Sequence, residues 1–314
     1  MRKILMRDYG SEDVLFEVNE NIPSITANQL LIKMVATSVN HIDVVMRKGG
    51  MQATMPPELQ PKFPHLLGQD FSGIVTQIGE TVTKFQVGDY VTGVTLTGTY
   101  SEYIAVDESS FVAKVPSDID LVPLGGLGVV TCTAWSAVIG HGQVKPNQRV
   151  LIHGGAGGVG SMAIQLAKNA GVYVITTATE SNKDFLKELG ADEIVDYTTV
   201  NFEEVLQDID LVIDTIGGTT QEKSYRVMKP AGKMFSTAGV PDQKKAVEYG
   251  VEAQFIRGDI RPETLHSIVS LYTDKKLKIH VDKIYHFTLD DIKNSHKDFE
   301  NGPNRGKRII SFSM

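Results

Sequence analysis

Three glycines in the middle of the chain are spaced to bind a dinucleotide. Gly155, Gly157 and Gly160 fit the pattern G-x-G-x-x-G, and they lie between an apolar run at 149–153 and a segment at 159–170. The apolar residues of that second segment are spaced for one buried helix face. In this context one glycine forms a tight turn, one lets backbone approach a pyrophosphate, and one lets the helix pack on the strand. A helix start also presents N–H groups to phosphates. The residues that we expect to bind the cofactor here are Gly155, Gly157, Gly158, Val159 and Gly160.

The end of the next expected strand, 172–176, indicates which dinucleotide is bound. An NAD site places a carboxylate about 20 residues past the glycines, where it accepts from the ribose 2′-OH. No carboxylate stands at this strand end. Hydroxyls and a cation suit a 2′-phosphate, so the sequence favours NADPH, unless Glu180 turns inward or Lys183 and Ser181 are only a solvated cation and a helix cap. The candidate contacts are Thr177, Thr179, Ser181 and Lys183.

Composition excludes several classes of function. The 314 residues carry a net charge of -7, which does not favour binding to nucleic acid or to an acidic membrane surface. No apolar run has the length of a membrane span. The single cysteine, Cys132, cannot form an intrachain disulfide, and the N-terminus is too charged for a signal peptide. We therefore expect a cytoplasmic protein.

The pattern of expected elements changes near residue 148. Residues 1–120 contain short runs of β-branched and aromatic residues between turn signals, which predicts a barrel or sandwich. After 148, strands alternate with helices, which predicts a doubly wound parallel sheet with ligand outside the carboxyl ends of its strands. Beyond about 265 the pattern relaxes, and this tail is expected to rejoin the first domain. An exposed loop is expected at 51–64 and a helical bridge at 121–140.

Several short stretches carry a resemblance to a known family, among them 38–43, 67–73, 87–91, 100–103, 133–135, 153–160, 189–192 and 305–307. In their order and spacing they resemble the medium-chain dehydrogenase/reductase superfamily and its zinc-free quinone and enone reductases. The resemblance covers nearly the whole chain and implies an α/β protein, with a GroES-like β-barrel domain and an inserted Rossmann domain. The first would comprise 1–124 plus 266–314 and the second 125–265. Relatives pair the edge strands of their nucleotide domains, so a homodimer through 253–256 is expected.

The zinc ligands of related alcohol dehydrogenases are not matched. Asn40 stands where the resemblance expects a cysteine, and Gln69-Asp70 stand where it expects the last two residues of Gly-His-Glu. An amide does not ionise and binds zinc poorly, so no metal is expected. Without a Lewis acid, reduction of an activated π-system is favoured over alcohol oxidation. The expected reaction is hydride transfer from NADPH to a quinone or to the C=C of an α,β-unsaturated carbonyl compound. The alternatives are a zinc-free aldehyde or alcohol oxidoreductase and an NADPH-binding sensor or structural protein with little turnover.

The resemblance also implies roles for residues outside the glycine turn. Asn40 would bond cofactor or substrate, and Thr133 would lie near the nicotinamide; a turn asparagine and a helix-buried hydroxyl are the structural alternatives. His41, Gln69 and Asp70 would border the substrate, or serve only as scaffold. Tyr197 would lie along the adenosine end of the cofactor. The strand-end residues at which backbone would approach the ribose or nicotinamide are Gly217, Ala238 and Gly239.

Overall fold

The computed structural model describes residues 1–52 and 56–313 and divides the chain into two compact units. The first unit comprises Met1–Val129, Ile260–Thr273 and Ile279–Met314, and the second comprises Val130–Asp259 and Asp274–Lys278. The domain boundaries expected from the sequence, 1–124 plus 266–314 for one domain and 125–265 for the other, stay a prediction. Each unit is described below by itself.

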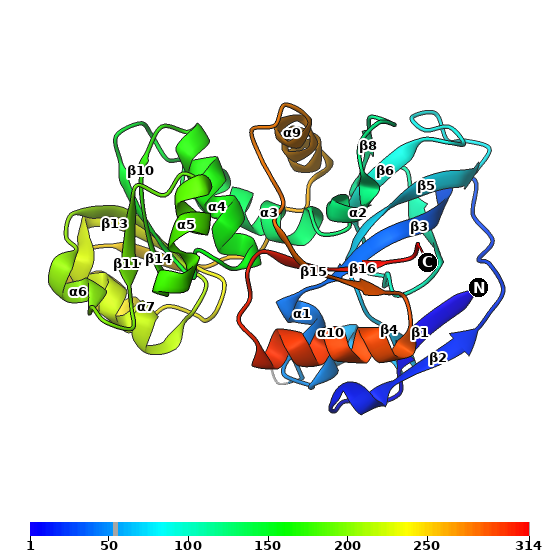
Figure 1. The fold of residues 1–314 in the computed structure, drawn as a ribbon, viewed down its shortest axis with the longest axis horizontal. Helices are drawn as coiled ribbons and strands as arrows, with labels where there is room; N and C mark the ends of the chain where they lie inside the picture. The colour runs from blue at the N-terminus through cyan, green and yellow to red at the C-terminus, as the bar shows by residue number, and fades with distance from the viewer. Residues whose placement is uncertain (53–55, 314) are drawn as a thin grey trace. The chain divides into compact units, whose positions relative to one another are not determined.

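Antiparallel strands dominate the first unit (Figure 1). Within the described residues one sheet has the order β15-β16-β3-β5-β6-β8, with β7 also paired to β3, and a smaller sheet has the order β2-β1-β4. The strands are β1 (Arg2–Met6), β2 (Leu15–Asn19), β3 (Gln29–Val39), β4 (His65–Leu66), β5 (Asp70–Ile78), β6 (Tyr90–Val94), β7 (Tyr103–Asp107), β8 (Val112–Val115), β15 (Val281–His286) and β16 (Lys307–Ser311). The helices assigned wholly to this unit are α1 (His41–Arg47), α2 (Leu121–Leu124), α9 (Pro262–Thr273) and α10 (Leu289–Asn301).

The C-terminal tail completes the first sheet, as the sequence predicted. β16 pairs antiparallel with β3, so that Arg308 lies opposite Val39 and Ile310 opposite Thr37. In Figure 1 the red end of the chain lies beside the blue strand β3. The apolar side chains of both strands are buried, which ties two segments distant in sequence into one core. This register also determines which residues meet where β3 ends.

The second unit is built on a parallel sheet with the order β11-β10-β9-β12-β13-β14. This order, 3-2-1-4-5-6 along the chain, is the doubly wound arrangement that binds dinucleotides, and it confirms the expected Rossmann fold. Buried aliphatic residues such as Leu151, Ile175 and Val212 form its core. The elements are β9 (Arg149–His153), α4 (Gly158–Asn169), β10 (Tyr173–Ala178), α5 (Lys183–Glu188), β11 (Glu193–Asp196), α6 (Phe202–Val205), β12 (Ile209–Asp214), α7 (Gly218–Ser224), β13 (Met228–Ser236), α8 (Gln243–Tyr249) and β14 (Glu252–Phe255).

Some expected elements differ in the structure. The bridge expected at 121–140 is not one helix: α2 ends at Leu124, α3 (Gly128–Trp135) follows, and a π-helical turn covers Ser136–Gly140. Gly125 and Gly126 lie in the turn between these helices, where a Cβ at either glycine would crowd Ala36 or Lys307. The helix expected at 221–228 ends early, since Met228 already begins β13. Of the loop expected at 51–64, residues 53–55 lie outside the described residues, and Pro57–Leu59 forms a 3-10 turn. Among the helices that the structure describes, none has both the length and the apolar character needed to cross a bilayer.

Candidate active site

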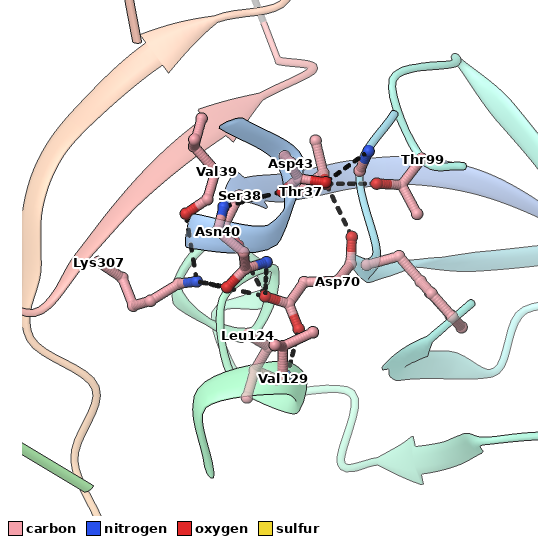
Figure 2. A network of polar contacts seen from close by, with 12 residues as sticks. Thr37, Ser38, Val39, Asn40, Asp43, Asp70, Thr99, Leu124, Val129 and Lys307 are labelled. Atoms are coloured by element: carbon pink, nitrogen blue, oxygen red, sulfur yellow. Dashed lines mark hydrogen bonds and ion pairs between the residues drawn. The ribbon is translucent and has the colours of Figure 1, made fainter. Parts of the chain in front are cut away.

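A buried polar network gathers three side chains from separate elements of the first unit (Figure 2). Asn40 precedes α1, Asp70 begins β5 and Lys307 begins β16. Nζ of Lys307 lies 2.6 Å from Oδ1 of Asn40 and 3.3 Å from Oδ2 of Asp70. Nδ2 of Asn40 donates to the same Asp70 oxygen at 2.9 Å. None of the three residues is more than 3% exposed, so these charges and dipoles interact in a medium of low dielectric.

The Asp70 carboxylate is the centre of this network. Oδ2 also accepts from the hydroxyl of Ser38 at 2.7 Å, and Oδ1 accepts from the backbone N–H of Val129 at 2.6 Å. A buried carboxylate with several donors and one cation is held in a single orientation. The sequence predicted Asp70 beside the substrate, and the structure places it directly against Asn40.

A second buried carboxylate, Asp43, fixes the backbone on either side of the network. It accepts from the N–H of Asn40 at 2.8 Å and from the N–H of Gly68 at 3.0 Å. Burial raises the pKa of Asp43 to about 7, while the two N–H donors and the Lys307 charge act in the opposite direction.

Arg47, one helical turn beyond Asp43, does not bond to it. From the sequence alone, the helical spacing of Asp43 and Arg47 leads us to expect that they are structural polar partners. Arg47 instead donates to the carbonyl of Gly10 at 2.6 Å and pairs with Glu300 of α10. These contacts fasten α1 to distant segments of the same unit, so Arg47 is scaffold rather than part of the network.

The two other residues predicted near the substrate lie outside the network. His41 is exposed, and its ring centroid lies 6.4 Å from that of Phe299. Gln69 is half-buried, and its side-chain amide has no hydrogen-bond partner among the described residues. Either side chain is available to a ligand, but neither helps to position Asn40.

The glycine turn of the second unit has the shape of a phosphate cradle. Gly154 has a φ of +72° and forms the tight turn, a role that the sequence had given to one of the three motif glycines. A Cβ at Gly155 would overlap Oγ1 of Thr176, and a Cβ at Gly160 would overlap the Gly154 carbonyl. A Cβ at Gly157 would instead have its nearest neighbour 3.4 Å away. Gly157 thus keeps space open at the start of α4, where the helix N-terminus favours an anion.

The loop after β10 contains the residues predicted to select the cofactor. Thr177 is buried, and its hydroxyl meets Nδ1 of His153 at 3.0 Å, so this side chain faces the interior of the unit. The hydroxyls of Thr179 and Ser181 lie 2.9 Å apart in an exposed position. Lys183 pairs with Glu180 at 2.8 Å, and this pairing raises its pKa.

A buried carboxylate organises the next two loops at the same edge of the sheet. Oδ1 of Asp214 accepts from the N–H groups of Ile216 and Gly217 at 3.0 and 2.8 Å. Oδ2 accepts from Ser236 at 2.8 Å, and the Ser236 hydroxyl accepts from the N–H of Ala238 at 3.2 Å. The backbone at Gly217, Ala238 and Gly239 is therefore positioned through Asp214, a residue that the sequence reasoning did not single out.

The remaining two predicted contacts belong to the second unit as well. Tyr197 follows β11 and is 59% exposed, so its ring is open to a ligand. Thr133 lies on α3 and is partly buried, and a Cβ at Gly258 would come within 3.0 Å of its Oγ1. Thr133 and Asn40 are in different units.

Comparisons with known proteins agree with this architecture. The family "Alcohol dehydrogenase GroES-like domain" matches residues 26–117, and the family "Zinc-binding dehydrogenase" matches 189–310. A solved quinone oxidoreductase from Coxiella burnetii is 31% identical in sequence to this chain, and the two structures align with a TM-score of 0.88. The alignment covers 100% of this chain and 99% of the Coxiella burnetii chain. The chain belongs to the medium-chain dehydrogenase/reductase superfamily.

Within this superfamily the chain lies in the quinone oxidoreductase-like branch. It is 34% identical over 253 residues to a chloroplastic NADPH-dependent alkenal/one oxidoreductase of Arabidopsis thaliana, covering 76% of this chain and 63% of that protein. It is 34% identical over 254 residues to the mitochondrial NAD(P)H oxidoreductase RTN4IP1 of Danio rerio, covering 74% of this chain and 65% of that protein. The chain thus spans just under two thirds of the length of these two relatives.

The residues present do not fit the zinc that one family description names. Zinc sites use thiolate, imidazole and carboxylate ligands, whereas the residues that the resemblance sets at the ligand positions, Asn40, Gln69 and Asp70, are two amides and one carboxylate. The Lys307 ammonium, 2.6 Å from Oδ1 of Asn40, also sets a positive charge beside this amide, and that charge would repel a metal cation bound there. In the described residues no three His, Cys, Asp or Glu side chains are grouped to hold a metal ion.

The second unit also has features that fit NADPH, the cofactor expected for this chain. The open cradle at Gly157 suits a pyrophosphate, and the exposed hydroxyls after β10 suit a polar ribose or its phosphate.

Sequence reasoning missed Lys307 and Asp214 as members of the two sites. Two signals in the sequence could have found them. Lys307 directly follows Gly306 at a strand start, and Asp214 ends a buried strand shortly before Gly217 and Gly218.

Proposed function

We propose that this chain is an NADPH-dependent, zinc-independent reductase of quinones or α,β-unsaturated carbonyl compounds. The observation that carries the proposal is the ammonium of Lys307 between Asn40 and Asp70. A fixed protein cation stands among the residues that would otherwise correspond to metal ligands. The names of the Coxiella burnetii and Arabidopsis thaliana proteins support the same class of reaction.

The chemistry of the network suits a substrate that already delocalises charge. Alcohol oxidation needs stabilisation of an alkoxide, which a metal ion usually supplies. A quinone or enone spreads the developing charge onto its oxygen, so directed N–H donors lower the barrier by stabilising that oxygen. Asn40 has one Nδ2 hydrogen that no described residue accepts, and this hydrogen is the proposed donor. When bound, NADPH supplies the hydride.

The second unit is proposed to hold NADPH through backbone and side chains at the carboxyl edge of its sheet. Gly157 and the start of α4 would receive the pyrophosphate, and the loops that Asp214 fixes would receive the ribose and nicotinamide. Thr179, Ser181 and Lys183 would receive the 2′-phosphate, whereas the buried Thr177 would support the loop from inside.

We also propose that this chain forms a homodimer through the edge strand β14. In the described part of the chain β14 is the last strand of the parallel sheet, and no strand pairs with its outer edge, where the Ala253 carbonyl accepts from the Gln243 side chain. Exposed apolar side chains lie near it: Val247 is 82% exposed and Phe255 is 40% exposed. Ile256 donates its N–H to Ser236 of β13, so the alternate residue Phe255 faces the outer edge. Replacing Phe255 with proline, which removes an N–H from that edge, should convert a dimer to a monomer in light scattering.

The compartment stays a prediction. The cytoplasm is the expected location, while the two relatives above are named as chloroplastic and mitochondrial proteins. Fractionation of cells that produce the full-length protein would decide between these locations.

The first test of the function is NADPH oxidation against a small substrate panel. The panel contains 1,4-benzoquinone, 9,10-phenanthrenequinone, a linear enone and a simple aldehyde, each with and without a chelator. Turnover of a quinone or the enone that survives chelation is expected. Turnover of only the aldehyde would favour an aldehyde reductase, and tight NADPH binding without turnover would favour a sensor. Activity that chelation abolishes and zinc restores would contradict zinc independence.

A further inference from the structure

Strand pairing and the space at a nearby glycine determine where Lys307 lies in the network. It begins β16, whose register puts Arg308 opposite Val39, so Lys307 stands beside the residue at which β3 ends. A Cβ at Gly126 would lie 2.9 Å from Cε of Lys307, which means that the chain leaves room for the lysine stem there. The site is thus built around this side chain.

The charges of Lys307 and Asp70 determine how the Asn40 carboxamide is oriented. An ammonium can only donate and a carboxylate can only accept. Oδ1 of Asn40 must therefore face Lys307 at 2.6 Å, and Nδ2 must face Asp70 at 2.9 Å. A flipped amide would set N–H against ammonium and carbonyl oxygen against carboxylate, both of which are repulsive.

The same geometry indicates that Lys307 is not the proton donor. Its ammonium has three hydrogens, and three acceptors surround it: Oδ1 of Asn40, Oδ2 of Asp70 at 3.3 Å and the carbonyl of Val39 at 3.5 Å. Burial lowers the pKa of Lys307, and the Asp70 carboxylate opposes this shift by favouring the ammonium. No hydrogen of the ammonium is left for a ligand, so any effect on a substrate acts through Asn40.

We propose that Lys307 is a positioning residue of the reduction site, which locks the Asn40 carboxamide so that its remaining Nδ2 hydrogen faces the carbonyl oxygen of a quinone or enone. This inference rests on the proposed reductase function. The ammonium at Oδ1 also polarises the amide, which makes the remaining N–H a stronger donor. Asp70 serves as counter-ion and as the second anchor of the same amide.

The first variant is Lys307→Met, which keeps most of the stem and removes the charge. It leaves Asp70 buried without a cation, so the unfolding midpoint should fall by about 5 °C or more. Turnover at saturating NADPH should fall at least about tenfold, because a donor to the developing oxyanion is no longer fixed. The KM for NADPH should stay within about twofold, since the proposed nucleotide contacts are on other residues.

A double variant separates positioning from simple charge compensation. Lys307→Met with Asp70→Asn removes both charges and should recover most of the lost thermal stability. Turnover should stay low, because nothing then dictates the orientation of Asn40. If the double variant regains turnover together with stability, Lys307 acts only as a counter-ion and the inference is wrong. Lys307→Met with wild-type turnover would overturn it as well.

Arg308→Met is the matched control on the neighbouring residue of β16. Arg308 is 7% exposed, donates to the carbonyl of Pro303 at 3.0 Å and lies 3.7 Å from Asp282, away from Asn40. Its loss should lower the unfolding midpoint without changing turnover. An equal loss of turnover in this variant would assign the effect of Lys307 to stability alone and contradict the inference.

A readout independent of turnover distinguishes this inference from the proposed function. In protein labelled with 15N-asparagine, the Nδ2 hydrogen of Asn40 that bonds Asp70 should exchange slowly with solvent, and its signal can be assigned by its loss in Asn40→Asp. Exchange should be at least about tenfold faster in Lys307→Met and unchanged in Arg308→Met. Slow exchange in a wild type without reductase activity would refute the proposed function but support the locked amide. Equal exchange in wild type and Lys307→Met would refute the lock.

Discussion

The hydroxyl of Ser236 donates to Oδ2 of Asp214 at 2.8 Å and joins the ends of two neighbouring strands, β12 and β13. Asp214 also accepts from the backbone of the loop that follows β12, and Ser236 accepts from the backbone of the loop that follows β13. The two loops are thus held by one pair of buried side chains. Because Gly217 and Ala238 lie in these loops, the pair controls the backbone that is predicted to meet the cofactor.

Ser236→Ala should weaken NADPH binding beyond its effect on stability. The variant removes a buried donor to Asp214, which should lower the free energy of unfolding by about 1–3 kcal/mol. The dissociation constant for NADPH, measured by quenching of protein fluorescence, should rise about threefold or more as the loops loosen. Lys229→Met is the control, because Lys229 pairs with Asp210 at the opposite end of the same strands. A similar loss of affinity in both variants would contradict this role.

The glycines of the turn should separate into two classes when each is replaced by alanine. Gly155→Ala would force a Cβ into Thr176, so we expect a lower unfolding temperature. Gly157→Ala meets nothing closer than 3.4 Å and has a φ of -73°, so the unfolding temperature should change little. Its methyl group would occupy the proposed phosphate cradle, and NADPH affinity should fall about tenfold or more. Gly157→Ala protein that binds NADPH normally would place the pyrophosphate elsewhere.

The Rossmann fold could be predicted because its signals are local. Strand and helix periodicity, and the glycines between β9 and α4, are all within one short stretch. The break between α2 and α3 was missed, and its glycines pack against distant strands: Gly125 against Ala36 and Gly126 against Lys307. Local propensity carries no information about such a contact.

The candidate site was only partly predictable for the same reason. Asn40 and Asp70 were found from a resemblance, but Lys307 is 267 positions from Asn40, and their contact depends on the pairing of β16 with β3. The predicted partner of Arg47 was also wrong. Helical spacing suggested Asp43, but Arg47 pairs with Glu300 of α10. Strand register and helix packing across the chain determine these pairs.

Cofactor preference should depend on the ion pair between Lys183 and Glu180. Lys183→Ala should raise the KM for NADPH more than that for NADH, because a cation near the 2′-phosphate is lost. Glu180→Gln frees Lys183 from its 2.8 Å partner and removes a repelling charge, so the preference for NADPH should increase about twofold or more. Both ratios come from initial rates with the two cofactors. An unchanged ratio in both variants would place the pair outside the phosphate site.

Stability at acid pH should depend on His296, which is buried between Arg47 and Tyr100. Its Nδ1 accepts from Nε of Arg47 at 3.3 Å, so a neutral ring carries its proton on Nε2, which lies 3.0 Å from the Tyr100 hydroxyl. Burial, together with the nearby Arg47 charge, lowers the pKa of His296 from 6.5 to about 3. The unfolded chain therefore binds this proton at a higher pH than the folded chain. The stabilisation is complete above pH 6.5 and is lost as the pH falls toward 3, at up to about 1.4 kcal/mol per pH unit.

His296→Gln tests this dependence, because glutamine can accept from Arg47 and donate to Tyr100 without titrating. Urea unfolding between pH 7 and pH 4.5 should show a shallower loss of stability in this variant than in the wild type. The exposed His286, replaced in the same way, is the control and should leave the slope unchanged. Parallel curves for wild type and His296→Gln would contradict the assignment. The buried His153, whose pKa burial lowers to about 4, should account for part of the slope that remains.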